Sequence, residues 1–181
     1  MSSEPEFRQQ EIRRGGFVIA GGGTAGHVLP GLAVAEALVS SGVAIGRHEV
    51  HMVGSRRGIE VDLVPAAGFG LTVMSGRGIR RRLTPANVAS LLGLLVGMFR
   101  AVFLLARHRP RAVVSLGGYA SVPCGLAAVL LRIPLVVVEQ NAVPGATNRL
   151  LGRFAQACAT SFPDTNLPLS LIHISEPRDR G

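Results

Sequence analysis

The 181-residue sequence is poor in aromatic side chains and in cysteine, and each shortage argues against a class of protein. It contains no tryptophan and one tyrosine, and aromatic residues make up 4% of the chain. A module that binds nucleic acid by stacking bases needs exposed aromatic rings, so we expect no nucleic-acid partner. The two cysteines, Cys124 and Cys158, lie in apolar surroundings without CxxC spacing. This pattern indicates buried free thiols in a reducing cytosol.

Charged residues are also scarce, at 17%, whereas 48% of the residues are hydrophobic. This composition excludes a disordered or repetitive chain, and the length suits one well-buried α/β domain. Residues 1–15 are polar and contain no apolar core of a secretory signal, so we expect a disordered arm there. The net charge of +8 is carried by arginine clusters. Such clusters indicate nucleic acid, anionic lipid or a phosphorylated substrate, or simply solvated faces.

Apolar runs and helical patterns alternate along the chain. The apolar runs predict strands at residues 17–20, 50–53, 71–74, 112–116, 135–138 and 157–160. The helical patterns lie at residues 32–40, 58–67, 87–107, 122–131 and 146–154. Strands without polar alternation predict a parallel sheet with helices on both faces, and repeated βα units predict a Rossmann-like α/β domain.

We expect this domain to cover residues 16–167. The strand and helix pattern breaks after Thr165, and residues 168–181 show no glycine turn, helix cap or clear periodicity. Their string SLIHISEP looks like translated sequencing-adapter read-through. We therefore expect this tail not to belong to the native protein.

Two glycine turns follow predicted strands. The first, GGGTAG at residues 21–26, precedes His27, and the second, GGY at residues 117–119, opens another helix. Glycines let the backbone approach a ligand closely, and a helix start offers N–H groups to an anion. Two such turns at neighbouring strand ends predict a two-sided cradle for a diphosphate. His27 adds a group that can move a proton near pH 7.

Polar side chains accompany these turns. Ser121 is placed to cap the second helix or to donate to a phosphate oxygen, and we expect Tyr119 to face the ligand rather than the core. Glu139, Gln140 and Asn141 end a third strand and either point into the same crevice or cap the next helix. A further amide one turn into that helix, that of Asn148, is placed to reach the same region.

The first turn also matches the dinucleotide pattern GxGxxG. A nicotinamide site would place an acid at the end of the second strand, but Arg56 and Arg57 lie there instead. Arginines suit the ribose phosphate of NADP, so an NADP-binding oxidoreductase domain is an alternative. That alternative leaves His27 and the second turn unexplained.

The apolar segment at residues 86–106 is long enough to span a bilayer, but Arg100 interrupts it and its leucines recur at helical spacing. Beside it, apolar residues flank three cations. This arrangement predicts a patch that contacts an anionic membrane surface, formed by Ile79, Arg80, Arg81, Arg82 and Leu83. A buried helix preceded by a solvated basic loop is the alternative.

Three motifs together resemble the N-terminal half of the MurG family, which are bacterial transferases that add N-acetylglucosamine to lipid-linked muramoyl-pentapeptide. The motifs are GGGTAGHVLPG at residues 21–31, GGYASVP at 117–123 and EQN at 139–141. The resemblance covers about residues 16–165. Two positions depart from it: Ala25 replaces a common glycine, and Val138 stands where many members have histidine.

The resemblance implies the N-terminal half of a glycosyltransferase-B fold. This chain would be the acceptor-binding half, with the undecaprenyl-diphosphate-linked muramoyl-pentapeptide as ligand. The C-terminal half, which binds UDP-N-acetylglucosamine, would be absent, so the chain would be inactive alone. The implied reaction belongs to peptidoglycan synthesis (lipid I to lipid II) and inverts the sugar's anomeric centre. It needs no metal or other cofactor and takes place at the cytoplasmic face of the bacterial membrane, where the protein would be peripheral.

Carried over by position, the resemblance assigns His27 as the base. It also assigns residues to the first diphosphate loop (Gly22, Gly23, Thr24, Gly26), the second loop (Gly117, Gly118, Tyr119, Ser121) and the acceptor pocket (Glu139, Gln140, Asn141, Asn148). A third possibility for the chain is a non-catalytic module that binds lipid surfaces.

Overall fold

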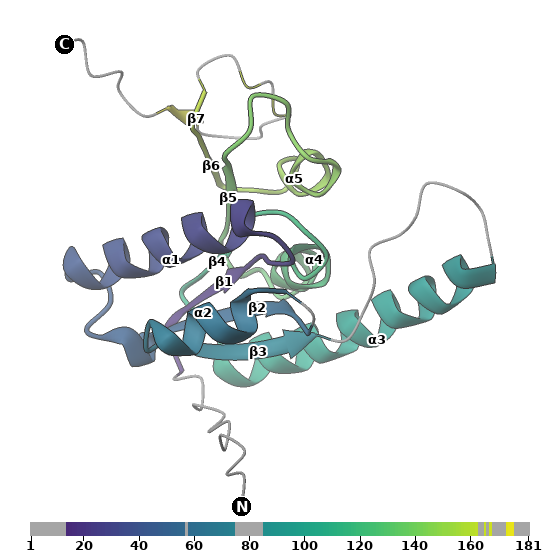
Figure 1. Ribbon diagram of the computed structural model, residues 1–181, viewed down its shortest axis with the longest axis horizontal. Helices are drawn as coiled ribbons and strands as arrows, with labels where there is room; N and C mark the ends of the chain where they lie inside the picture. Colours follow the sequence, from purple (N-terminus) through teal and green to yellow (C-terminus); the bar gives the residue numbers. More distant parts are fainter. Residues whose placement is uncertain are drawn as a thin grey trace, which may run out of the picture.

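A computed structural model describes residues 14–56, 58–74, 85–162, 165, 167 and 173–175. Its seven strands form one parallel sheet in the order β3-β2-β1-β4-β5-β6-β7 (Figure 1). The strands are β1 (Phe17–Ala20), β2 (Val50–Ser55), β3 (Gly70–Met74), β4 (Ala112–Ser115), β5 (Leu135–Glu139), β6 (Ala157–Thr160) and β7 (His173–Ser175). The predicted parallel sheet of a Rossmann-like α/β domain is confirmed.

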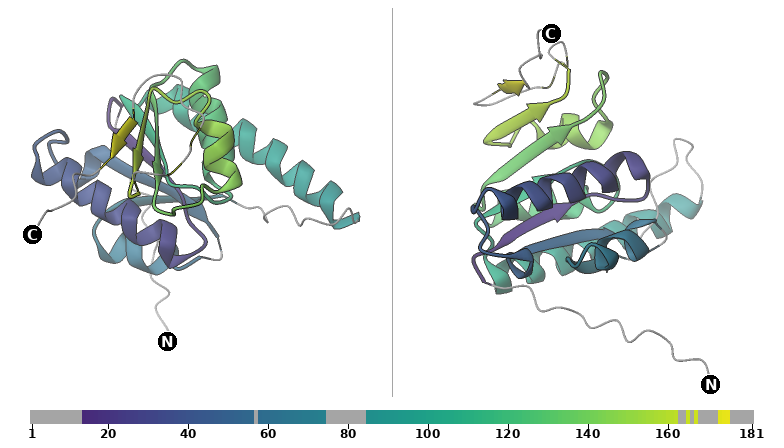
Figure 2. Two further views of the ribbon diagram at one scale, coloured as in Figure 1. Left: turned by 90° about the horizontal axis from the view of Figure 1, so that it is seen from above. Right: turned by 60° about the vertical axis from the view of Figure 1, so that its left-hand side comes forward.

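The helices cover both faces of this sheet. They are α1 (Ala25–Ser40), α2 (Glu60–Ala66), α3 (Pro85–His108), α4 (Ser121–Leu130) and α5 (Ala146–Leu151), with a short 3₁₀ turn, η1 (Arg47–Glu49). Figure 2 (right) shows α1 and α2 in front of the sheet and α3 behind it. Alternate residues of β1 serve the two sides: Ile19 packs in the core that contains Val28 of α1, and Val18 packs in the core that contains Leu105 of α3.

The order of the strands fixes where a ligand can bind. The chain leaves β1 toward β2 on one side and returns to β4 on the other, with Ala20 paired to Ser115 at the ends of these two strands. In open parallel sheets, ligands bind beyond the carboxyl ends of the strands where the order reverses. The two glycine turns, which follow β1 and β4, occupy that position.

Helix α1 begins seven residues before its predicted start at residue 32, so Pro30 and Gly31 lie inside it. Gly31 lets the helix approach the sheet, because a Cβ there would fall 2.8 Å from Leu116 Cδ1 and 2.9 Å from Met52 Cε. Pro30 has no N–H to donate to the carbonyl of Gly26 one turn earlier. The side-chain amide of Gln140, 114 residues away, donates to that carbonyl at 2.9 Å. A residue of the third strand end therefore completes the first turn of α1.

Two elements were not predicted from the sequence. One is η1, and the other is β7, which pairs with β6 through His173–Ser175. Parallel pairing at a sheet edge needs only backbone groups, so three residues can form such a strand without a hydrophobic pattern. The expectation that residues 168–181 are not native remains a prediction. Of the expected arm over residues 1–15, residues 1–13 lie outside the described residues, whereas Arg14 and Gly15 are described and the N–H of Gly15 donates to the carbonyl of His108 at 3.1 Å.

His51 of β2 is buried in this sheet. Its Nε2 lies 2.8 Å from Thr72 Oγ1 of β3. Burial, together with the nearby His108, lowers the pKa of His51 from 6.5 to about 4. The folded protein therefore holds this ring neutral at pH values where the unfolded chain protonates it.

We expect the stability of the protein to fall as the pH drops from 6.5 toward 4. Below pH 6.5 the unfolded chain binds a proton at His51 that the folded chain excludes, which amounts to about 2 kcal/mol of unfolding free energy between pH 7 and pH 5. Urea unfolding at both pH values measures the change. His51→Gln removes this contribution and flattens the pH dependence. Equal slopes for the wild type and His51→Gln would contradict the prediction.

We also expect Pro30 and Gln140 to be energetically coupled. Gln140→Ala leaves the Gly26 carbonyl without its donor and destabilises the protein by about 0.5–1.5 kcal/mol. In a Pro30→Ala background the helix supplies its own N–H to Gly26, so the same change costs about 1 kcal/mol less. A double-mutant cycle by urea unfolding isolates this difference from the other effects of removing proline. Equal costs of Gln140→Ala in the two backgrounds would show that the bond contributes nothing.

Candidate functional site

The two glycine turns contact one another just beyond the carboxyl ends of β1 and β4. A Cβ on Gly118 would lie 2.7 Å from the carbonyl oxygen of Gly22, closer than real side chains come. The backbone angle φ is +91° at Gly23, +92° at Gly117 and +83° at Gly118. Side chains disfavour this left-handed region, so glycine is required for both the conformation and the contact. The sequence prediction that the turns are neighbours is confirmed.

His27 lies between the two turns. It belongs to the first turn of α1 and is half-buried. Its Nδ1 lies 2.9 Å from Thr24 Oγ1, and its Nε2 faces the second turn, where a Cβ on Gly117 would be 3.1 Å away. When Nδ1 donates its proton to the threonine hydroxyl, Nε2 carries the lone pair and can accept a proton. The geometry thus directs the basic nitrogen toward the space between the turns.

The third strand end is organised by Glu139, which is 1% exposed. Its Oε1 accepts from the backbone N–H and side-chain amide of Asn141, at 3.0 and 2.8 Å. Its Oε2 accepts from the N–H of Gly145 and the side-chain amide of Asn148, both at 3.0 Å. Of the two alternatives from the sequence, the carboxylate therefore holds the loop before α5 and does not project into the crevice.

The two asparagines differ in accessibility. Asn148 is 2% exposed, and its amide also donates to the carbonyl of Val138 at 3.0 Å. Its Nδ2 would lie 3.6 Å from a Cβ on Gly117, so this buried amide packs against the second turn. Asn141 is exposed. Asn141 can thus contact a ligand directly, whereas Asn148 supports the turn that would do so.

Ser121 corrects one prediction. Helix α4 begins at Ser121 with Ala120 as its N-cap residue, and no side chain caps it. The serine is fully buried, and its Oγ lies 2.6 Å from the carbonyl oxygen of Ala20 and 2.7 Å from that of Gly117. A hydroxyl has one hydrogen to donate, and it is directed to these carbonyls. Ser121 joins the end of β1 to the second turn and is neither the expected cap nor a donor open to a phosphate.

Tyr119 also differs from the expectation that it faces the ligand. Its hydroxyl oxygen is buried and has no hydrogen-bond partner among the described atoms. A Cβ on Gly97 of α3 would lie 3.8 Å from this oxygen, so the hydroxyl packs in ordinary van der Waals contact beside that helix. Burial raises the pKa of Tyr119 above 10. The hydroxyl therefore lies beside α3 and not in the space between the glycine turns.

Glu60 was missing from the sequence-based site residues. It opens α2, is fully buried, and accepts hydrogen bonds from the backbone of Gly23 in the first turn and of Ser55 at the end of β2. The available signal was an acid soon after the second strand, where a dinucleotide site would carry one. Acids in the first turn of a helix are usually solvated, and the sequence alone does not show that this one is enclosed.

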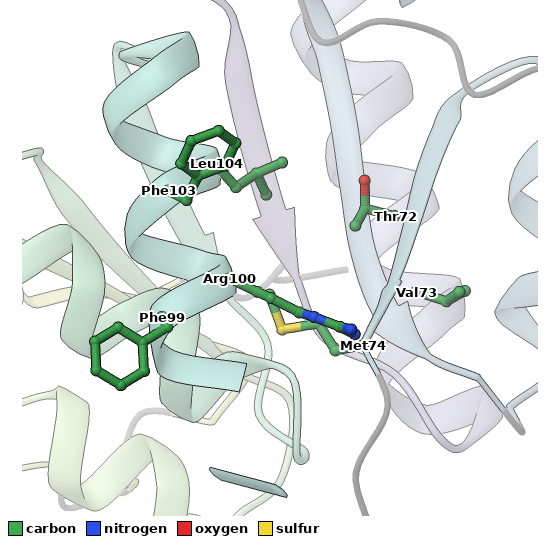
Figure 3. Close-up of a pocket in the computed structure, with 7 residues that line it drawn as sticks. All are labelled: Thr72, Val73, Met74, Phe99, Arg100, Phe103 and Leu104. Atoms are coloured by element: carbon green, nitrogen blue, oxygen red, sulfur yellow. The ribbon is translucent and has the colours of Figure 1, made fainter. Parts of the chain in front are cut away.

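A separate cavity of about 440 Å³ lies between β3 and α3 (Figure 3). Figure 3 shows Arg100 extending from α3 toward Met74. Phe99 and Phe103 on the same helix are 76% and 71% exposed. The remaining lining residues are Thr72, Val73 and Leu104. The lining is apolar apart from Arg100 and Thr72, and it does not include the glycine turns.

Some of the residues predicted to bind lipid or cofactor fall outside the part of the chain that the structure describes. The predicted membrane patch, Ile79, Arg80, Arg81, Arg82 and Leu83, lies outside the described residues, as does Arg57. None of the helices in the described ranges combines the length and apolar character needed to cross a membrane. Within the same ranges, no three histidine, cysteine or acidic side chains gather in a way that could hold a metal ion.

Known proteins resemble this chain in sequence and in fold. The glycosyltransferase family 28 N-terminal domain matches residues 17–160. A UDP-N-acetylglucosamine–N-acetylmuramyl-(pentapeptide) pyrophosphoryl-undecaprenol N-acetylglucosamine transferase from an Anaeromyxobacter species is 45% identical over 151 residues, or 82% of this chain and 38% of the relative. The transferase of the same name from Alkalilimnicola ehrlichii is 47% identical over 160 residues, or 88% of this chain and 43% of the relative.

The crystal structure of Acinetobacter baumannii MurG superposes with a TM-score of 0.71 at 30% identity, covering 91% of this chain and 47% of that one. The chain thus spans about two fifths of the length of the curated relatives it matches. These likenesses do not favour the NADP-binding alternative. Because the family match covers more than half of its residues, the chain belongs to the glycosyltransferase family 28 N-terminal domain family and is a homologue of the MurG transferases.

Proposed function

We propose that this chain is the acceptor-binding half of a transferase that adds N-acetylglucosamine to the undecaprenyl-diphosphate-linked muramoyl-pentapeptide of peptidoglycan synthesis. The position of His27 carries the proposal, because its Nε2 faces the space between two touching glycine turns. The names of the relatives support the substrates. The donor, UDP-N-acetylglucosamine, would bind to the remaining part of the protein, which these relatives have and this chain does not span.

The proposed step is a displacement at the anomeric carbon of the donor. His27 Nε2 takes the proton of the acceptor hydroxyl as its oxygen attacks C1 of the sugar. The new C1–O bond forms while the bond from C1 to the diphosphate breaks, and UDP leaves. Thr24 orients the imidazole through its contact with Nδ1. A ring held in this way loses little freedom when it reaches the geometry of reaction.

The acceptor diphosphate would lie against the glycine turns. Backbone N–H groups at a helix start favour an anion, and α4 begins directly after the second turn. Gly22 and Gly118 keep the two turns in contact, so a diphosphate on the second turn would lie beside His27. Asn141 is exposed at the end of β5; its amide nitrogen donates to Glu139, and its amide oxygen would suit sugar hydroxyls or peptide amides.

The base role of His27 predicts a selective loss of rate. In the whole protein, His27→Ala should lower kcat by about 10²–10⁴-fold, because the acceptor hydroxyl keeps its proton in the attack. The KM for UDP-N-acetylglucosamine should stay within about twofold, since this substrate binds elsewhere. The assay follows transfer to a short-prenyl analogue of the lipid acceptor. His48→Ala, at an exposed position, is the control. A His27→Ala enzyme with undiminished kcat would remove His27 from the mechanism.

The proposed division into an acceptor-binding half and a donor-binding half also predicts how this chain behaves alone. Residues 1–181 should bind the acceptor analogue but transfer no sugar, because catalysis needs both substrates to be positioned together. Calorimetric titration and the transfer assay measure the two properties on one sample. Robust transfer by the isolated chain would contradict the division of labour between the halves.

We further propose that the domain contacts an anionic membrane on its cytoplasmic face. The support is the exposed apolar surface of α3, where Leu95 and Val96 are about half exposed and Phe99 and Phe103 more so, while the exposed Arg100 of the same helix supplies a cation. Aromatic and apolar side chains enter the interface while cations meet the phosphates. The predicted patch at residues 79–83 adjoins this helix in the sequence.

Vesicle sedimentation tests the membrane proposal. Binding to vesicles that contain anionic lipid should exceed binding to neutral ones. It should fall about tenfold in a Phe99→Ser, Phe103→Ser variant or when Arg80, Arg81 and Arg82 become alanine. Ile45→Ser is the matched control, because Ile45 is 81% exposed on another part of the surface. Equal binding by all these proteins would exclude this surface as the contact.

A further inference from the structure

We propose that Glu60 is the positioning residue of the candidate site, which holds the first glycine turn so that His27 faces the second. The role of His27 in the transfer rests on the proposed function above. The contribution of Glu60 to its position rests on separate observations.

The carboxylate of Glu60 joins two strand ends. Its Oε1 accepts from the N–H of Gly23 at 3.0 Å, from the N–H of Ser55 at 2.6 Å and from the hydroxyl of Ser55 at 2.9 Å. Its Oε2 lies 3.2 Å from the same N–H of Gly23. The glutamate is fully buried. The two backbone N–H groups can only donate and the hydroxyl of Ser55 donates here, so the position requires acceptor oxygens, which a carboxylate supplies.

Three glycines make room for this side chain. A Cβ on Gly54 would lie 2.6 Å from Cγ of Glu60, and a Cβ on Gly22 or Gly58 would overlap its carboxylate. These glycines come from the turn after β1, from β2 itself and from the segment before α2. The carboxylate therefore occupies a cradle built from three separate parts of the chain.

The link from Glu60 to His27 is short. Gly23, whose N–H the carboxylate holds, immediately precedes Thr24. The carbonyl of Thr24 accepts from the backbone N–H of His27 at 3.1 Å, and its hydroxyl contacts the imidazole. Gly23 has a φ of +91° and no side chain to anchor it. Its N–H bond to Glu60 is thus the fixed point from which the orientation of the histidine follows.

The same bond determines where a diphosphate can lie. The N–H of Gly23 already faces two carboxylate oxygens, and their negative charge opposes a phosphate placed there. None of the described contacts places a carboxylate against the backbone of the second turn or of the start of α4. The first turn therefore orients the base, and the second turn is left to hold the diphosphate.

Substitutions at Glu60 separate this role from simple packing. Glu60→Gln keeps the shape of the side chain and one acceptor oxygen, but it places an NH₂ group where Oε2 now faces the N–H of Gly23 at 3.2 Å. Glu60→Ala removes every bond and leaves buried donors unpaired. Asp62→Asn is the matched control, because Asp62 is an exposed acid two residues further along α2.

The experiment measures the position of His27 by NMR in the 181-residue chain. The imidazole Cδ2 lies within 3.3 Å of the Cβ position of Gly117, so the wild type should show cross-relaxation between the ring and the Gly117 Hα protons. Glu60→Gln should lose this signal, and its affinity for the short-prenyl acceptor analogue should fall about tenfold. Asp62→Asn should keep both. If Glu60→Ala does not fold, the glutamine variant decides the question.

Each outcome has one meaning. A folded Glu60→Gln variant that melts earlier but keeps the cross-relaxation and the affinity would overturn the proposal, since Glu60 would then be structural only. Loss of the cross-relaxation with weaker binding would support it. If the wild type binds no acceptor analogue, the proposed function fails, and the cross-relaxation still decides whether Glu60 positions His27.

Discussion

The close approach of the two glycine turns is the constraint on which the site depends. Parallel strands lie about 4.8 Å apart, so the chain leaving β1 and the chain leaving β4 emerge side by side. Side chains at this point would hold them apart, and the carbonyl of Gly22 leaves no space for a Cβ on Gly118. Because the turns have no side chains of their own at the contact, neighbouring residues must fix their conformation.

Buried side chains fix the conformation of the turns and neighbouring loops through hydrogen bonds. Glu60 accepts from the first turn and Glu139 accepts from the loop before α5, and both carboxylates are enclosed. Ser121 joins the second turn to β1, and Gln140 completes the first turn of α1. Bonds to an ionised acceptor are stronger than those between neutral groups, so two glutamates can organise loops that glycine makes flexible. The result is a rigid support under a surface of exposed backbone.

The sequence predicted the parts of this arrangement that depend on local pattern. Unbroken valine and isoleucine runs indicated a parallel sheet, and the glycines before His27 indicated a turn at a strand end. It failed where a distant residue decides the local structure. The helical pattern began only at residue 32, but the amide of Gln140 and the close packing on Leu116 allow the helix to include Pro30 and Gly31. The roles of Ser121 and Glu60 were missed for the same reason, since their burial follows only from the assembled sheet.

The bond between Gln140 and Gly26 also has a consequence for the order in which the protein matures on the ribosome. The helix that carries His27 is synthesised early, but the donor for its first turn is made 114 residues later. Ser121 reaches back to Ala20 across 101 residues in the same way. The nascent chain therefore cannot complete the surroundings of its histidine until β5 has left the exit tunnel. The two ends of the domain acquire their final geometry together.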